Sequence, residues 1–211
     1  MGLIGGILQP MQANFSVVLM SPIDFLIEPF VWLKAVSKYQ ATLSGGPNFA
    51  YELCLKRITP EQKKTLDLSS WIIAANGAEP IRHETMEKFA EAFAECGFKK
   101  SAFFPCYGLA EATLYVCGRS AAKTWKSISV ESKALENGTV KKPSPNQPSR
   151  NLVSSGKPIN DQEILIVDKE KKIRLKENSV GEIWYRHPSV AQGYYNQPEK
   201  TKETFGAYLA N

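Results

Sequence analysis

Two apolar runs on either side of one amphipathic helix limit the fold of this 211-residue chain more than any other sequence feature. Trp71-Ile-Ile-Ala-Ala75 and the run at 102–106 are short and apolar, as buried strands are. Residues 81–96 between them repeat apolar side chains at helical spacing, and Gly97 then suits the position after a helix. The order strand, helix, strand predicts parallel strands joined by a right-handed crossover. The sequence therefore predicts an α/β fold in which helices flank a parallel sheet.

Local signals mark the ends of other elements. Ser21 followed by a proline, and Thr59 in the run Thr-Pro-Glu-Gln, have the residue pattern of a helix N-terminus. Pro29 interrupts a helical pattern, and we expect the helix to restart there and to run to about Tyr39. Phe15–Met20 is a short run of residues that favour strands.

The composition changes twice along the chain. Residues 118–150 are rich in Lys, Ser, Pro and Asn, which is typical of a loop or an insertion. After them, the runs at 162–167 and 181–185 have the residue pattern of strands separated by a polar turn. We therefore expect an α/β subdomain over residues 1–117, an insertion or loop over 118–150, and a smaller, mainly β subdomain over 151–211.

Composition argues against several classes of protein. The net charge is +5, but the basic residues are scattered, which does not favour nucleic acid as a partner. Four cysteines without CxxC spacing and two histidines do not complete a usual zinc site, and they are typical of reduced thiols in the cytoplasm. No apolar stretch approaches the roughly 20 residues that span a bilayer. We expect a globular cytoplasmic protein with no membrane span.

Two motifs follow the predicted strands and indicate a ligand site. Asn76-Gly-Ala-Glu-Pro80 lies where one strand ends, and Tyr107-Gly-Leu-Ala-Glu-Ala-Thr113 follows the next. Ligands of open α/β sheets bind beyond the carboxyl ends of the strands. Gly77 and Gly108 allow a flat ligand to approach the backbone, and the tyrosine ring offers a face to an aromatic base. Glu111 supplies an oxygen ligand of the kind that Mg²⁺ prefers. Taken alone, the same residues also fit ordinary strand-to-helix turns with a capping glutamate.

The order of four motifs resembles that of adenylate-forming enzymes. The two motifs above are followed by Gly181-Glu-Ile-Trp184 and by Pro188-Ser-Val-Ala-Gln-Gly-Tyr-Tyr-Asn196, at similar spacing. Within that superfamily, Ser44-Gly-Gly-Pro-Asn-Phe-Ala-Tyr51 and the form YGLAEAT resemble fatty acyl-AMP ligases. The resemblance covers essentially the whole chain, and it implies a part of the large N-terminal domain of such an enzyme.

The resemblance implies roles for the matching positions. The adenine pocket would be lined by Asn76, Gly77, Ala78, Glu79, Pro80, Tyr107, Gly108, Leu109 and Ala110. The acyl chain would be flanked by Gly2, Leu3, Ile4, Ser44, Gly45 and Gly46. Glu111 would bind the Mg²⁺ that bridges the phosphates of ATP. Ala110 departs from the superfamily pattern, because many members have a threonine there that contacts phosphate, and Thr113 cannot be assumed to replace it.

The implied activity is the conversion of a fatty acid and ATP to acyl-AMP, followed by transfer to an acyl carrier protein. The sequence has no phosphate loop ending in lysine and no catalytic lysine of a C-terminal domain. We therefore expect an internal fragment that contains no catalytic residue and is inactive alone. Two alternatives stay open: an acyl-CoA synthetase, which differs in the acceptor thiol, and a non-catalytic remnant or binding module. Pyrophosphate exchange and a choice between coenzyme A and carrier protein would separate them.

The 118–150 stretch is similar to an extra segment of fatty acyl-AMP ligases that disfavours transfer to coenzyme A by restraining the C-terminal domain. An unremarkable surface loop is the alternative. If the stretch is ordered, we expect its main apolar side chains to dock on the α/β body. These side chains are Trp125, Ile128, Val130 and Leu135.

Overall fold

The computed structural model describes residues 1–120, 123–158 and 162–210. Its helices are Gln9–Ala13 (α1), Pro22–Ile27 (α2), Phe30–Tyr39 (α3), Asn48–Arg57 (α4), Pro60–Lys63 (α5), His83–Ala92 (α6), Ser132–Glu136 (α7) and Pro198–Phe205 (α8). Its strands are Leu43–Gly46 (β1), Ile73–Asn76 (β2), Phe103–Leu109 (β3), Leu114–Gly118 (β4), Ser127–Glu131 (β5), Ser149–Val153 (β6), Lys157–Pro158 (β7), Glu163–Asp168 (β8), Ile173–Arg174 (β9) and Glu182–Arg186 (β10). A π-helical turn at Ile4–Leu8 precedes α1, and short 3-10 helices occupy Ala94–Cys96, Lys100–Ala102 and Ala110–Ala112.

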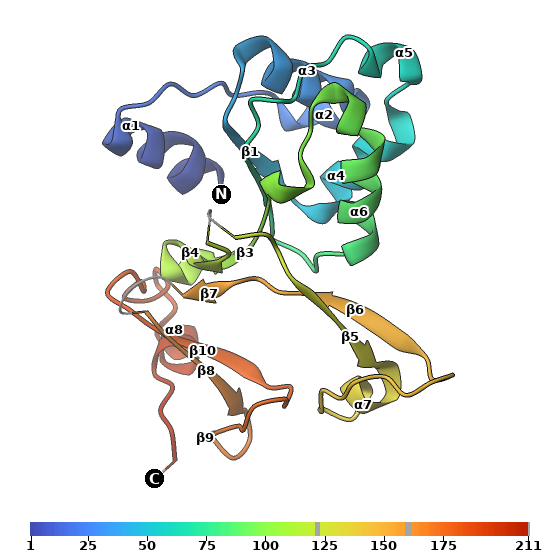
Figure 1. The fold of residues 1–211 in the computed structure, drawn as a ribbon. Helices are drawn as coiled ribbons and strands as arrows, with labels where there is room; N and C mark the ends of the chain where they lie inside the picture. Colours follow the sequence, from blue (N-terminus) through green and yellow to red (C-terminus); the bar gives the residue numbers. More distant parts are fainter. Residues whose placement is uncertain (121–122, 159–161, 211) are drawn as a thin grey trace.

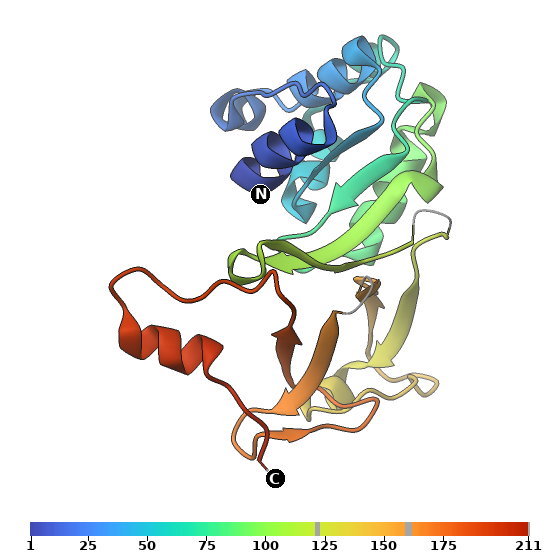
Figure 2. The ribbon, with the colours of Figure 1, turned by 90° about the vertical axis from the view of Figure 1, so that its left-hand side faces the viewer.

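The largest sheet has the strand order β1-β2-β3-β4-β7. β1, β2 and β3 are parallel, as the strand, helix, strand order predicts, and the sheet runs between the N-terminal helical turns and the helices α4 and α6 (Figures 1 and 2). The sheet as a whole is mixed, because β4 runs antiparallel to β3 and β7 runs antiparallel to β4. The cause is the second motif, whose first three residues extend β3 before the chain turns back into β4.

One apolar core holds α3, α4 and α6 against the parallel strands. Trp32, Tyr51, Trp71, Phe89 and Phe103 meet there in mainly edge-to-face contacts, and all five are buried. Each such ring buries on the order of 150–250 Å² of surface on folding, so this cluster dominates the stability of the α/β body. The same core positions the ends of β2 and β3.

The predicted helix signals are confirmed, with one helix shorter than expected. Ser21 Oγ accepts a hydrogen bond from the Asp24 N–H, and Thr59 forms a capping box at α5. α3 begins after Pro29 and ends at residue 39. α6 ends at Ala92 and continues as a 3-10 turn to Gly97, whose φ of 85° terminates it. Residues 15–20 have no regular secondary structure, although their composition favours a strand, since no strand of the described residues pairs with them.

The second half of the chain is mainly β and lies beside the β3–β4 hairpin (Figure 1). β5 and β6 form a two-stranded antiparallel sheet, and β10-β8-β9 form a three-stranded one. The stretch 118–150 therefore contains a strand and the short helix α7 rather than loop alone, and β6 extends past it to Val153. The division of the chain into three subdomains stays a prediction. Across the described residues, no helix is both long and apolar enough to cross a membrane.

Candidate functional site

The motif at 76–80 begins at the buried end of β2. Asn76 is fully buried, and neither polar atom of its side-chain amide has a hydrogen-bond partner among the described residues. An unpartnered buried polar group costs about 1–3 kcal/mol, so such an amide needs an explanation. β2 pairs with β3 in the register Asn76 to Pro105, which places the start of the second motif two residues beyond the paired position. The first two motifs therefore lie on neighbouring strands, with their starts two residues apart in register.

The two glycines of these motifs are required by the fold. A Cβ at Gly77 would lie 2.7 Å from the Cys106 carbonyl oxygen, and a Cβ at Gly108 would overlap the carbonyl oxygen of Leu114. In this structure, the backbone of Cys106 approaches Gly77 closely, and the backbone of Leu114 approaches Gly108. Ala78, between Gly77 and Glu79, has a φ of 69°, a left-handed conformation that is uncommon for a residue with a side chain.

Glu79 joins the first motif to the N-terminus of α4. Its Oε1 accepts a hydrogen bond from the Phe49 N–H at 2.5 Å, where the positive end of the helix dipole favours a carboxylate. Asn48 is buried next to it, accepts from the Arg82 N–H at 3.0 Å, and donates to Thr85 Oγ1 at 3.3 Å. Asn48 thus fixes the turn between Pro80 and α6. Sequence reasoning did not single out Asn48, although it lies within the run Ser44–Tyr51.

The second motif forms the tip of the β3–β4 hairpin. Tyr107, Gly108 and Leu109 lie in β3, with a change of pairing register after Tyr107, and Ala110 begins the 3-10 turn. Tyr107 and Leu109 pack on a small cluster that also contacts Ile164 and Tyr185 from the β8–β10 sheet. Burial raises the pKa of the Tyr107 hydroxyl. The hairpin therefore connects the α/β body to the mainly β part.

Glu111 contacts the fourth motif directly. The Tyr194 hydroxyl donates a hydrogen bond to Glu111 Oε1 at 2.5 Å, and the Ala191 N–H donates to the Glu111 carbonyl at 2.8 Å. Thr113 Oγ1 donates to the Ser189 carbonyl at 2.6 Å. The bond from Tyr194 lowers the pKa of the Glu111 carboxyl and raises that of its own hydroxyl. Glu111 is therefore held as a carboxylate.

The donor set around Glu111 suits a cation that takes few ligands from the protein. Among the described residues, no group of three or more His, Cys, Asp or Glu side chains is close enough together to hold a metal ion. A dedicated zinc or calcium site is therefore not formed by these residues. Mg²⁺ often takes one or two carboxylates and completes its shell with water and phosphate oxygens, so a single Glu111 fits that role.

The positions expected to flank an acyl chain come from two elements. Ser44 and Gly46 face the core side of β1, and Ser44 Oγ accepts from Trp32 Nε1 at 2.8 Å, a structural bond. Gly2 and Leu3 lie in the exposed N-terminal helical turn. Gly5 of that turn lies against Leu114 of the hairpin, since a methyl group added at Gly5 would lie 3.4 Å from Leu114 Cδ2. An apolar cavity of about 400 Å³ is lined by Gly6, Ile7, Pro10, Met11, Asn14, Phe15, Val17 and Leu19.

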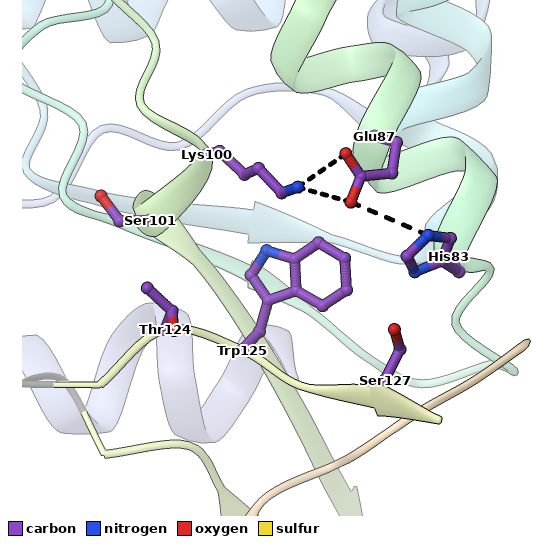
Figure 3. Close-up of a pocket in the computed structure, with 7 residues that line it drawn as sticks. All are labelled: His83, Glu87, Lys100, Ser101, Thr124, Trp125 and Ser127. Atoms are coloured by element: carbon purple, nitrogen blue, oxygen red, sulfur yellow. Dashed lines mark hydrogen bonds and ion pairs between the residues drawn. The ribbon is translucent and has the colours of Figure 1, made fainter. Parts of the chain in front are cut away.

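A second cavity of about 500 Å³ lies where the β5–β6 hairpin meets α6. The Trp125 ring lies under the ion pair of Lys100 and Glu87, whose closest atoms are 2.6 Å apart (Figure 3). His83 contacts the ring edge at a centroid distance of 5.4 Å. Because Glu87 already neutralises Lys100, and Lys100 already lies over the ring, the local charges are satisfied within the chain. We interpret this cavity as the junction that attaches the hairpin.

A sequence-family model described as AMP-binding enzyme matches residues 1–195. This chain belongs to the AMP-binding enzyme family. It is 44% identical over 212 residues to a medium-chain-fatty-acid–acyl-carrier-protein ligase of Moorena producens, covering 99% of the chain and 36% of the relative. It is 40% identical over 207 residues to a ligase of the same description from Teredinibacter turnerae, covering 98% of the chain and 32% of that relative.

Solved structures agree with the family assignment. The crystal structure of a fatty acid AMP ligase from Legionella pneumophila superimposes with a TM-score of 0.95 at 50% identity, covering 100% of the chain and 37% of that protein. A Legionella pneumophila fatty acyl-adenylate ligase in complex with acyl adenylate and pyrophosphate gives 0.94 at 49% identity, over 99% of the chain and 37% of that protein. The resemblance to adenylate-forming enzymes and the α/β class are confirmed. The chain spans about a third of the length of these relatives.

Proposed function

We propose that this chain forms the adenine-facing and metal-facing part of an enzyme that converts a fatty acid and ATP to acyl-AMP. The observation that carries the proposal is the contact between Glu111 and Tyr194, which joins the second and fourth motifs of the resemblance at one edge of the sheet. The buried side-chain amide of Asn76 has no hydrogen-bond partner among the described residues, and Asn76 pairs in register with Pro105, two residues before the second motif. Adenine would bind along residues 76–80 and 107–110.

The chemistry requires positioning and charge neutralisation. The fatty acid carboxylate attacks the α-phosphorus of ATP, the bond to the bridging oxygen breaks, and pyrophosphate leaves with the negative charge. Mg²⁺, when bound, supplies positive charge to the phosphate oxygens. Glu111 would hold the cation through its carboxylate. Residues 76–80 and Tyr107 would hold the base and so orient the α-phosphate toward the acyl carboxylate.

The acyl chain would pass the N-terminal turn and β1. Support comes from the apolar cavity of about 400 Å³ whose lining residues begin, in chain order, at Gly6, two residues after Ile4. Leu3 is 63% exposed and Leu43 of β1 is 55% exposed, so both offer free apolar surface. Ser44, Gly45 and Gly46 would border the chain through β1 backbone, since the Ser44 hydroxyl is already bonded to Trp32.

An acyl carrier protein is the proposed acceptor, and the cytoplasm the proposed location. The named relatives are carrier-protein ligases, and all four cysteines are free thiols. Coenzyme A is the alternative acceptor. We propose that the stretch 118–150 disfavours it, and the support is that Trp125 packs against the core of the body. A docked segment can restrain a neighbouring domain through contacts that differ between two domain orientations.

The test is a hybrid enzyme in which residues 1–211 replace the matching segment of the Moorena producens ligase, 36% of its length. Fatty-acid-dependent exchange of pyrophosphate into ATP is expected in the hybrid. Glu111→Gln should reduce the exchange at least a hundredfold at low Mg²⁺, with a normal unfolding transition. A folded hybrid without exchange would favour a non-catalytic binding module, and full exchange in the Glu111→Gln hybrid would refute the metal assignment.

A further inference from the structure

Tyr194 has several contacts besides the one with Glu111, including one between its hydroxyl and the Thr204 side chain. Its backbone N–H donates to Thr201 Oγ1 at 2.9 Å, and its ring meets Phe205 edge-on at a centroid distance of 5.3 Å. Both partners lie in α8. Gly193 before it has a φ of 152°, and a Cβ there would overlap the Thr201 side chain. Tyr194 therefore has a fixed place between α8 and the β3–β4 hairpin.

The hydroxyl of Tyr194 is bonded to only one of the two oxygens of the Glu111 carboxylate. Glu111 Oε1 accepts the bond from Tyr194, and the Glu111 main chain is fixed separately by the Ala191 N–H. With its backbone and one oxygen fixed, the carboxylate has a defined rotamer and leaves Oε2 for another partner. A partner that holds a metal ligand in one orientation typically changes metal affinity ten- to a hundredfold.

We propose that Tyr194 is a positioning residue for the cation-binding carboxylate of Glu111, and that it couples the cation to α8. The inference rests on the proposed function, which places Mg²⁺ at Glu111. Binding of a cation to Oε2 stabilises the rotamer that Tyr194 requires, and by reciprocity the ordered loop before α8 favours the cation. Loss of the hydroxyl therefore weakens cation binding and loosens residues 189–205 together.

The experiment uses the 211-residue chain itself. Mn²⁺ with α,β-methylene-ATP is titrated into the chain, and paramagnetic broadening of the amide signals of residues 109–113 reports binding. Tyr194→Phe keeps the ring against Phe205 and removes only the hydroxyl. Tyr195→Phe is the matched control, because the neighbouring Tyr195 side chain is 90% exposed. Hydrogen exchange at Ala191 and Thr201 is the second readout, which requires no metal.

Tyr194→Phe should raise the Mn²⁺ midpoint about tenfold and speed exchange at Ala191, whereas Tyr195→Phe should leave both within twofold. Glu111→Gln should abolish the broadening. If Glu111→Gln abolishes it but Tyr194→Phe binds Mn²⁺ like the parent, the positioning role is wrong and the metal assignment stands. If Glu111→Gln binds normally, or the parent chain shows no broadening at residues 109–113, both are overturned. Unchanged exchange at Thr201, which lies in α8, would refute the coupling to α8.

Discussion

The ammonium group of Lys100 lies 5.4 Å from the centre of the Trp125 ring, and Glu87 pairs with the same ammonium. This contact joins the 3-10 turn before β3 to the segment that leads into β5. Val130 of the same hairpin is buried, whereas Ile128 is 55% exposed. Of the apolar side chains expected to dock on the body, Trp125 therefore does so, and Ile128 stays at the surface.

Trp125→Ala should destabilise the chain by roughly 2 kcal/mol, less than a fully buried tryptophan because the ring is only half-buried. It should also speed hydrogen exchange across β5 and β6. Urea unfolding and hydrogen exchange measure the two effects. Ile128→Ala is the matched control and should change the free energy of unfolding by less than about 0.5 kcal/mol. Equal losses in the two variants would show that the hairpin is not attached through Trp125.

In the hybrid enzyme, Trp125→Ala should raise acyl-CoA formation while acyl-AMP formation stays within about twofold. The reason is that a loss of about 1–2 kcal/mol of docking energy shifts the proposed orientation equilibrium by about tenfold. Fatty acid, ATP and coenzyme A are supplied, and both products are quantified. If adenylation persists and acyl-CoA stays at background, the stretch 118–150 is an ordinary surface segment.

Gly108→Ala should disrupt the β3–β4 hairpin, because the added methyl would overlap the Leu114 carbonyl oxygen. We expect a loss of about 2–4 kcal/mol of unfolding free energy. Gly2→Ala, where no atom lies within 4 Å of the added methyl, is the control and should be nearly neutral. A thermally normal Gly108→Ala chain would mean that the hairpin tip can shift at little cost.

Stability should fall at alkaline pH because of Cys54. Burial raises the pKa of its thiol from 9.0 to about 12, so the unfolded chain ionises first. A raised folded-state pKa contributes stability that is present below about pH 9 and is lost as the pH rises toward 12. Cys54→Ala should therefore show a shallower decline above pH 9 than the parent, with a constant difference between the two at lower pH. Parallel curves from pH 7 to 11 would contradict the assignment.

Local sequence signals predicted the helix ends, because the residues that form such an end lie close together in the chain. The capping box at Thr59 and the helix stop at Gly97 depend on residues within one turn, so residue type alone indicates them. The order of the motifs identified the family because the motifs are spread along most of the chain, from residue 44 to residue 196. The long strand β3 was underestimated, since Tyr107 and Gly108 are held in it by the facing strand β4, which local patterns do not reveal.

Long-range contacts within the candidate site could not be predicted in the same way. Glu111 was singled out by its motif, but its partner Tyr194 lies 83 positions later, and nothing in the spacing pairs them. Asn48 was missed for a similar reason, because apart from Glu52 in its own helix its partners are in the turn before α6 and in α6 itself. Whether residues 76–80 and 107–110 hold adenine stays a prediction.

The most direct test of that central prediction is photolabelling of the hybrid enzyme with 8-azido-ATP and Mg²⁺, followed by peptide mapping. Label should be confined, within this chain, to peptides that contain residues 76–80 or 107–110, and excess ATP should prevent it. Asn76→Ala should lower the labelling, whereas Ile128→Ala should not. ATP-protected label at the cavity around Trp125, with none on either motif, would contradict the proposed site.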